Sequence, residues 1–166
     1  MQTRKNPRLS GYDYSREGVY FVTICTAGRQ RLLGTVRPAV GGDAHIAPPS
    51  TGSSAAVDLT SLGKVAEKYL RSMPGVEKYV VMPDHVHILV RIANGPMRAS
   101  APTASLTKLI RSFKALCTKA AGHPLWQRGY YDHIIRDEND FFRCWKYLEE
   151  NPSSWQEHYP TENTKL

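Results

Sequence analysis

Hydrophobic residues follow two different periods along the first part of the chain, and their order predicts its secondary structure. The β-branched and aromatic run VYFVTICT at 19–26 predicts a strand. Apolar residues at helical spacing over 62–73 predict a helix, which a Pro-Gly pair ends. Two further hydrophobic runs, 76–82 and 85–92, predict a hairpin that turns at Pro83 and Asp84.

The second half of the chain continues the same alternation. A helical stripe over 106–117 predicts a second long helix, and 126–136 is typical of a strand. A final helix is expected to begin after Asp137, a suitable N-cap, and to end at Asn151 because Pro152 disfavours helical geometry in the residue before it.

The order strand, helix, strand, strand, helix, strand predicts the fold class. It is the α+β, ferredoxin-like (split β-α-β) arrangement, an antiparallel sheet with helices on one face, followed here by a C-terminal helix. We expect residues 1–166 to form a single domain. Within it, the stretch 35–57 is dense in Gly, Pro, Ser and Ala and predicts a flexible insertion loop.

Composition narrows the function classes. The chain has 166 residues, of which 41% are hydrophobic, and this is typical of a globular domain. No run approaches the ~18 apolar residues of a membrane span, and the N-terminus lacks a secretion signal, so we expect a cytoplasmic protein without a membrane partner. Its 3 cysteines fit neither a disulfide framework nor a Cys-x-x-Cys metal site. The net charge of +7 favours a polyanionic partner.

Two histidines lie two residues apart at the start of the second hairpin strand. Because successive side chains of a strand point to opposite faces, His85 and His87 share one face, with Cα atoms roughly 6.6 Å apart. Imidazoles placed in this way can converge on one metal ion. A His-x-His triplet alone is a weak signal, since two polar residues on the wet face of a strand give the same pattern.

The final helix carries a second candidate pair. Tyr147 lies roughly 110° from the centre of the apolar stripe of this helix, so it is not an obvious core residue. Asn151 follows one turn later on the same side. A surface tyrosine followed by a helix-capping asparagine would give the same pattern. The stripe itself consists of Phe141, Cys144, Trp145 and Leu148.

Three ordered motifs resemble one protein family. The segments MPDHVH (82–87), WQRGYYDHIIR (126–136) and YLEENP (147–152) together resemble the REP-associated tyrosine transposases, relatives of the single-tyrosine HUH transposases of simple bacterial insertion sequences. The segments GYDY and YFVTICT near the N-terminus resemble the family's opening strand, so the likeness runs from Arg8 to Trp155. One departure is Asp84, where the family usually has Asn.

The resemblance implies an enzyme that cleaves and rejoins single-stranded DNA through a 5′-phosphotyrosine, and that recognises hairpin (REP-like) sequences. It implies Tyr147 as the catalytic nucleophile and His85, His87 and Asn151 as metal ligands. The mixed N and O donor set suits Mg²⁺ or Mn²⁺ as the cofactor. Members of the family include monomers and homodimers, and the sequence leaves both open here.

Two other functions remain open from the residues alone. With His133 as third ligand, the histidines would form a three-histidine site typical of a zinc hydrolase. A four-stranded sheet with aromatic residues also describes non-catalytic nucleic-acid-binding modules. Tyr130 and Tyr131 are minor alternatives as nucleophile.

Basic residues in two regions are candidate DNA contacts. One group forms a short arm before the first strand, and the other recurs at three-residue steps along the second helix. The DNA-binding candidates are Arg4, Lys5, Arg8, Lys108, Arg111 and Lys114. For the helix, solvated charge is an equally good explanation.

Overall fold

The computed structural model describes residues 12–37, 55–93 and 105–158, and the side chains as far as Trp155. A 4-stranded antiparallel sheet in the order β4-β5-β1-β6 forms its centre, and a 2-stranded sheet, β2-β3, lies beside it. The strands of the large sheet are β1 (Gly18–Cys25), β4 (Val76–Met82), β5 (His85–Ile92) and β6 (Tyr131–Ile134). The long helices are α1 (Ser61–Ser72), α2 (Leu106–Ala121) and α3 (Glu138–His158).

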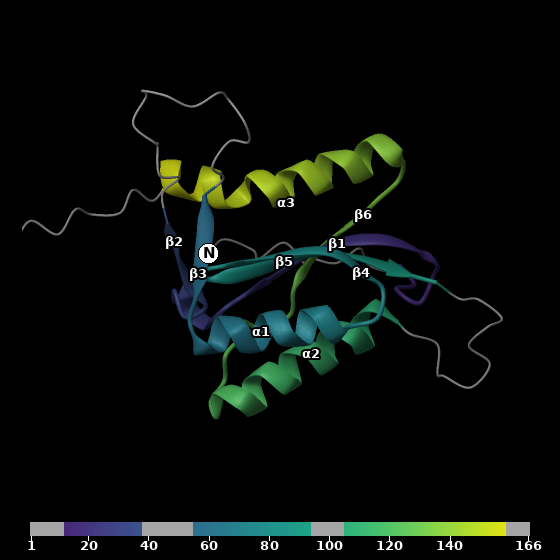
Figure 1. Cartoon of the computed structure of the whole chain (residues 1–166). Coiled ribbons are helices and arrows are strands. Elements are labelled where there is room, and N and C mark those ends of the chain that lie inside the picture. The colour runs from purple at the N-terminus through teal and green to yellow at the C-terminus, as the bar shows by residue number, and fades with distance from the viewer. Residues whose placement is uncertain (1–11, 38–54, 94–104, 159–166) are drawn as a thin grey trace, which may run out of the picture.

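The helices cover the two faces of the large sheet unequally. Helices α1 and α2 lie together on one face, and α3 crosses the other (Figure 1). This strand order and layering confirm the predicted ferredoxin-like fold with an added C-terminal helix. None of the helices in the described residues is long and apolar enough to cross a membrane.

Strand β5 shows how the sequence separates the two layers. Ile88 and Val90 are fully buried in the cluster that includes α1 and α2, whereas Leu89 packs with Leu148 of α3. The alternation places His85 and His87 on the α3 face, because they share the parity of Leu89. Strand β1 is central, and its Thr23 lies opposite His87 on β5.

Specific contacts fix α3 at its start and farther along its length. The backbone N–H of Asp140 donates to Asp137 Oδ1 at 2.8 Å, which confirms Asp137 as the N-cap. Farther along the helix, Lys78 of β4 donates to Glu149 Oε1 at 2.6 Å and lies 4.0 Å from the ring centroid of Trp145. The predicted stripe of Phe141, Cys144, Trp145 and Leu148 packs on the sheet as expected.

The interpretation of 35–57 as a loop is wrong at both of its margins. Strand β2 (Gly34–Arg37) pairs with β3 (Ala56–Leu59), with Val36 opposite Val57. The pairing buries Val36 beside Met82 of β4, which explains why these short runs become strands despite the Gly- and Pro-rich sequence between them. That intervening sequence, 38–54, lies outside the described residues.

The last predicted strand is much shorter than 126–136. Only Tyr131–Ile134 forms β6, and Trp126 makes a single bridge to Thr26. Between them, Gly129 has φ 79°, and Lys114 Nζ donates to the carbonyls of Gln127 and Gly129 at 2.6 and 2.9 Å. The carbonyls are therefore bound by a lysine of α2 rather than by a neighbouring strand.

Helix α3 does not end at Asn151 as predicted but continues through Pro152 to His158. A proline inside a helix removes one hydrogen bond and costs about 3 kcal/mol. Pro152 is buried, and Trp155 one turn later packs against the cluster formed by Val36 and Met82. We infer that this packing offsets the cost of the proline.

Helix α1 approaches the chain before β2 closely enough to require glycine. A Cβ atom added to Gly63 would lie 1.9 Å from the carbonyl oxygen of Leu33. The start of α1 is capped by Thr60, whose hydroxyl accepts from the Gly63 N–H at 3.2 Å. Glycine therefore allows α1 to pack directly on the backbone that leads into β2.

Candidate active site

One pocket between the sheet and α3 brings together all of the predicted metal ligands and the predicted nucleophile. It has a volume of about 470 Å³, and His85, His87, Tyr147 and Asn151 all line it. The histidines come from β5, and the other two residues come from α3. Side chains up to 66 positions apart therefore meet because α3 crosses the strand that carries the histidines.

The two imidazoles point at each other through their Nε2 atoms, and a side chain contacts the Nδ1 atom of each. Their Nε2 atoms lie 3.0 Å apart. Nδ1 of His85 is 2.6 Å from Asp84 Oδ1, and Nδ1 of His87 is 2.8 Å from Thr23 Oγ1. Groups that bind the far nitrogen of a histidine fix its tautomer and aim the near nitrogen, as partners of metal-binding histidines do.

The pocket disfavours positive charge on His87. Burial, then the charges of His85 and Arg29, lower the pKa of His87 from 6.5 to about 3. His87 is therefore neutral near pH 7, and a neutral imidazole nitrogen is the form that binds a metal ion.

Tyr147 lies over the same histidine. Its ring centroid is 5.3 Å from that of His87 and 5.8 Å from that of Phe21, both edge-on. Tyr147 is 49% exposed, so it is open to solvent. Asn151, one turn along α3, is buried, with 7% of its surface exposed. The predicted spacing of four residues thus places Tyr147 at the mouth of the pocket and Asn151 in its wall.

Four further residues line the pocket that sequence reasoning did not assign to it: Thr23, Arg29, Ser154 and Trp155. Thr23 follows from register, because it lies opposite His87. Trp155 lies beyond the expected end of the helix, and its ring centroid is 5.7 Å from that of His85. Only the continuation of α3 past Pro152 brings Trp155 to the pocket, and no local signal indicated that continuation.

The alternative site residues lie elsewhere. His133 does not line the pocket; its Nε2 contacts both carboxylate oxygens of Asp140 at 2.8 and 3.0 Å. Tyr130 is buried in the core on the α1 and α2 side. Tyr131 is 55% exposed on the same sheet face as Thr23 but is not a lining residue.

His133 belongs to a second group of metal-ligating type. The donor atoms of His133, Asp140 and Cys144 lie within 4.8 Å of one another, where β6 meets the start of α3. Asp140 also accepts from the Arg136 N–H at 3.1 Å and from Arg143 at 3.2 Å. These bonds are sufficient to explain the group as a structural contact that holds the start of α3 against β6.

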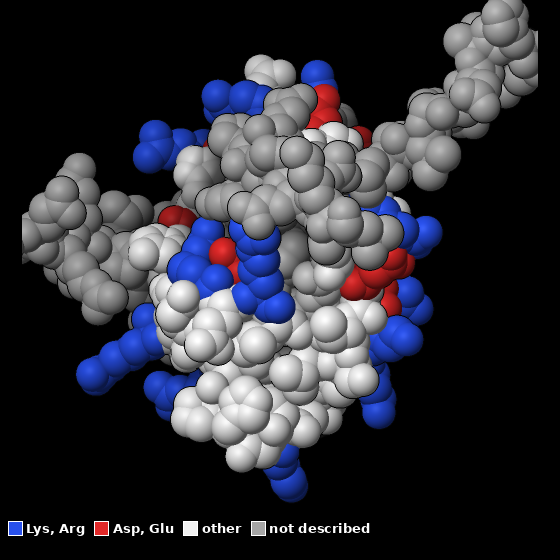
Figure 2. Space-filling model, turned by 90° about the vertical axis from the view of Figure 1, so that its left-hand side faces the viewer, with Lys and Arg blue, Asp and Glu red and all other residues white. Residues whose placement is uncertain are grey.

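The candidate DNA contacts are only partly described. Arg4, Lys5 and Arg8 lie outside the described residues. Lys108 and Arg111 are exposed on α2, and that helix covers the sheet face opposite to the histidines. Figure 2 shows one face of the molecule, on which Lys and Arg side chains project at separate places rather than as one continuous patch.

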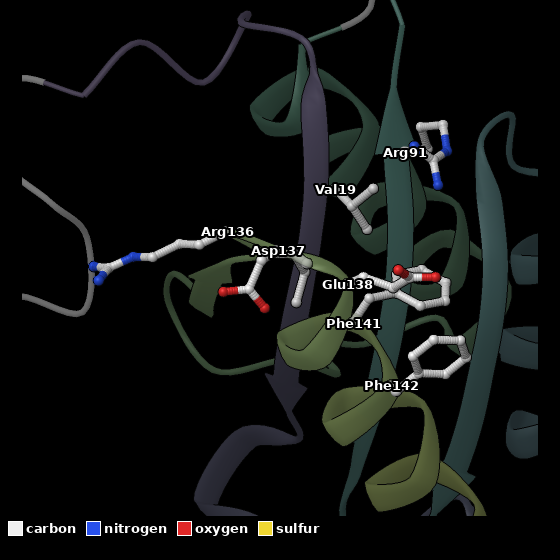
Figure 3. Close-up of a pocket in the computed structure, with 8 residues that line it drawn as sticks. Val19, Arg91, Arg136, Asp137, Glu138, Phe141 and Phe142 are labelled. Carbon is white, nitrogen blue, oxygen red and sulfur yellow. The ribbon is translucent and has the colours of Figure 1, made fainter.

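A second hollow, of about 400 Å³, lies at the other end of α3. Its rim includes Arg91 and Arg136 together with Asp137 and Glu138, so the formal charges balance. In Figure 3, Arg136 points away from the rings of Phe141 and Phe142. The hollow contains none of the predicted site residues and has no excess of positive charge for a polyanion.

The chain matches known proteins in sequence and in fold. No family model matches it. It is 28% identical over 179 residues to an uncharacterized protein of Haemophilus influenzae, covering 93% of this chain and 91% of that protein. It is 30% identical over 80 residues to a "putative REP-associated tyrosine transposase" of the same organism, covering 43% and 46% of the two chains.

A solved structure gives the comparison of fold. It is the structure of a REP-associated tyrosine transposase bound to a REP hairpin, with a TM-score of 0.56 and 21% identity. The match covers 89% of this chain and 74% of that one. The chain thus has the fold of a REP-associated tyrosine transposase, which confirms the resemblance that its motifs indicated.

Proposed function

We propose that this protein is a transposase that cleaves and rejoins single-stranded DNA through a 5′-phosphotyrosine, with Tyr147 as the nucleophile. The observation that carries the proposal is the shared pocket of His85, His87, Tyr147 and Asn151. The fold and the partial sequence match to REP-associated tyrosine transposases support it.

The donor set fits a divalent cation. His85 and His87 present converging Nε2 atoms, and Asn151 contributes an amide to the same pocket. Two imidazoles with an amide oxygen leave positions for water and phosphate, and their mixed chemistry suits Mg²⁺ or Mn²⁺. A bound ion would supply positive charge to the phosphate and orient it.

Tyr147 performs the covalent step. Its phenolic oxygen forms a bond to phosphorus as the proton of the hydroxyl passes to water, and the bond between phosphorus and the 3′ oxygen breaks. The products are a 5′-phosphotyrosine and a strand that ends in a 3′-hydroxyl. Because the phosphodiester is exchanged rather than hydrolysed, a 3′-hydroxyl can attack the phosphotyrosine to rejoin the strand without a nucleotide cofactor.

The decisive experiment is to look for the covalent intermediate. Purified protein is incubated with a single-stranded oligonucleotide that carries a REP-like hairpin, with Mn²⁺, Mg²⁺ or chelator, and the adduct is mapped by peptide mass spectrometry. We expect an adduct on Tyr147 with either metal and none with chelator, while circular dichroism shows that the chelated protein stays folded. Adduct on Tyr131, or none under any condition, would contradict the proposal.

Metal analysis of the same protein addresses the zinc hydrolase. That function requires His133 beside His85 and His87, but His133 is bound to Asp140 outside the pocket. Stoichiometric zinc that resists dialysis and is lost in His133→Ala together with DNA cleavage would favour it. A non-catalytic binding module would retain hairpin affinity without forming any adduct.

Hairpin recognition is assigned to the N-terminal arm. We propose that Arg4, Lys5 and Arg8 contact the stem or foot of the hairpin while the pocket holds the single strand. Deletion of residues 1–8 should reduce the preference for hairpin over unstructured DNA and leave cleavage of saturating single strand unchanged. An unaltered preference would remove the arm from recognition.

A further inference from the structure

The proposed active site contains an arginine, Arg29, beside the proposed metal ligands and nucleophile. Of the described residues that line the pocket, Arg29 is the only one that is charged at every physiological pH. Its side chain is 47% exposed, and its guanidinium also donates to Cys25 Sγ at 2.8 Å. A DNA phosphate brought to this pocket would meet that charge.

The backbone holds Arg29 in an unusual conformation. Arg29 has φ 56° and follows Gly28 at φ 62°, and it is the one residue other than glycine with a positive φ in the described part of the chain. This conformation costs roughly 1–2 kcal/mol, and such strain is concentrated at functional sites. Hydrogen bonds fix it: Arg29 N donates to Thr26 O at 3.0 Å, and Thr26 N donates to Asp84 O at 2.9 Å.

A chain of side-chain contacts connects Arg29 to the proposed nucleophile. Its Nε is 3.2 Å from Asp84 Oδ2, and the other oxygen of Asp84 contacts His85. His85 contacts His87, and the ring of His87 lies beside that of Tyr147. Arg29 is thus next to one end of the histidine pair, and Tyr147 is next to the other.

This order is compatible with the two sides of a displacement at phosphorus. The attacking and leaving oxygens of phosphoryl transfer lie roughly in line, on opposite sides of the phosphorus atom. If Tyr147 attacks from the His87 end, the leaving 3′ oxygen is on the side of His85 and Arg29.

We propose that Arg29 binds the leaving 3′ oxygen in the cleavage reaction. The inference rests on the proposed function. As the bond from Tyr147 to phosphorus forms and the bond to the 3′ oxygen breaks, an N–H of Arg29 donates a hydrogen bond to the oxygen that takes the electron pair. Arginine keeps its own proton, so water protonates the oxygen to the 3′-hydroxyl. In rejoining, the same contact stabilises that oxygen as the attacking anion.

A change of leaving atom tests this role. A substrate with sulfur in place of the scissile 3′ oxygen expels a thiolate, which needs little stabilisation. With Mn²⁺, Arg29→Gln should slow adduct formation about 10²- to 10³-fold on the oxygen substrate and less than about tenfold on the sulfur substrate. Arg71→Gln, which removes an exposed arginine of α1 on the other side of the sheet, should behave as wild type on both. Equal losses on both substrates, or no loss on oxygen, would overturn the proposal.

A metal-binding measurement separates this role from an indirect one. If Arg29 only positions Asp84 and His85, then Arg29→Gln and Asp84→Asn should weaken Mn²⁺ binding alike, as measured by electron paramagnetic resonance, and this result would overturn the proposal. We expect Arg29→Gln to leave Mn²⁺ affinity unchanged. If the glutamine variant does not fold, Arg29→Lys keeps the charge, and its defect should also be relieved by sulfur.

The same experiments distinguish failure of the proposed function from failure of the proposed role of Arg29. A wild-type protein that forms no adduct contradicts the proposed function, and the role of Arg29 falls with it. A wild-type protein that forms adduct on Tyr147 while Arg29→Gln matches its rate contradicts only the role of Arg29.

Discussion

The two faces of the central sheet are built from the same strands but differ in what they bury. On the α1 and α2 face, residues such as Ile88 and Val90 are fully buried among other apolar side chains. On the α3 face, apolar packing around Leu89 covers only part of the sheet, and the rest holds two buried imidazoles. One strand thus supplies a hydrophobic core to one face and a polar pocket to the other.

The difference shows what a buried polar pocket requires of a fold. Buried polar groups lower stability unless they are hydrogen-bonded, and His85 and His87 are bonded through Asp84 and Thr23. The face packed by α1 and α2 can therefore stabilise the domain while the α3 face keeps accessible groups such as Tyr147. Substitutions on each face should consequently affect different measurements.

The largest effect is expected at Tyr147. Tyr147→Phe removes only the hydroxyl of a half-exposed side chain, so the free energy of unfolding should change by less than about 0.5 kcal/mol. Covalent adduct formation should fall about 10⁴-fold or more, because the proposed nucleophile is lost. Gel analysis of protein-DNA adducts and urea unfolding measure the two quantities. Tyr131→Phe is the matched control, and an equal defect in that variant would contradict the assignment.

The second prediction concerns pH in metal-free protein. The pKa of His87 falls from 6.5 to about 3 on folding, so the unfolded chain binds a proton that the folded protein excludes. The resulting stability is complete above pH 6.5 and is lost as pH decreases toward 3, by up to about 1.4 kcal/mol per pH unit. His87→Leu should remove this part of the slope in urea unfolding with chelator present. The same slope in both proteins would show that another group causes it.

Lys114 provides a smaller effect on the other side of the sheet. Lys114→Met keeps the aliphatic chain but removes the donor to Gln127 O and Gly129 O. We expect the free energy of unfolding to decrease by about 1–3 kcal/mol. Lys119→Met, at an exposed position of the same helix, should change it by less than about 0.5 kcal/mol. Loss of DNA affinity without loss of stability in Lys114→Met would instead support a phosphate contact.

The smallest effect is expected at Lys108 and Arg111. If each contacts a phosphate, replacement by Gln should reduce the slope of log affinity against log salt by up to ~0.7 to 0.9 per contact, equally for hairpin and unstructured DNA. Cleavage at saturating DNA should not change. Lys64→Gln on α1 is the control. An unaltered slope would show that neither side chain contacts a phosphate.

Much of the fold could be predicted because its signals are local. The hairpin strands were predicted with the observed bounds, 76–82 and 85–92, since the alternation lies within the two segments and the Pro83 turn lies directly between them. The pairing of β2 with β3 was not predicted, because it depends on a contact across 38–54. Helix α3 exceeded its predicted length for a similar reason: Pro152 signals an end locally, but burial of Trp155 against distant residues favours continuation.

The site shows the same division. Strand periodicity predicted that His85 and His87 lie on one face of their strand. Helix periodicity predicted that Tyr147 and Asn151 lie on one side of the final helix. That α3 brings both pairs to one pocket was implied by the resemblance rather than by spacing. Arg29 was not predicted, because it follows the strand in a conformation that no pattern of hydrophobic residues indicates.

The pairing of Thr23 with His87 joins residues separated by 64 positions. Such distant pairings make folding slow, since the entropy of closing a long loop is lost before the contact forms. During synthesis, β1 cannot pair with β5 until β5 has been made. The pocket cannot form until α3 has also been made. The pocket should therefore be complete only after the residues as far as Trp155 have been synthesised.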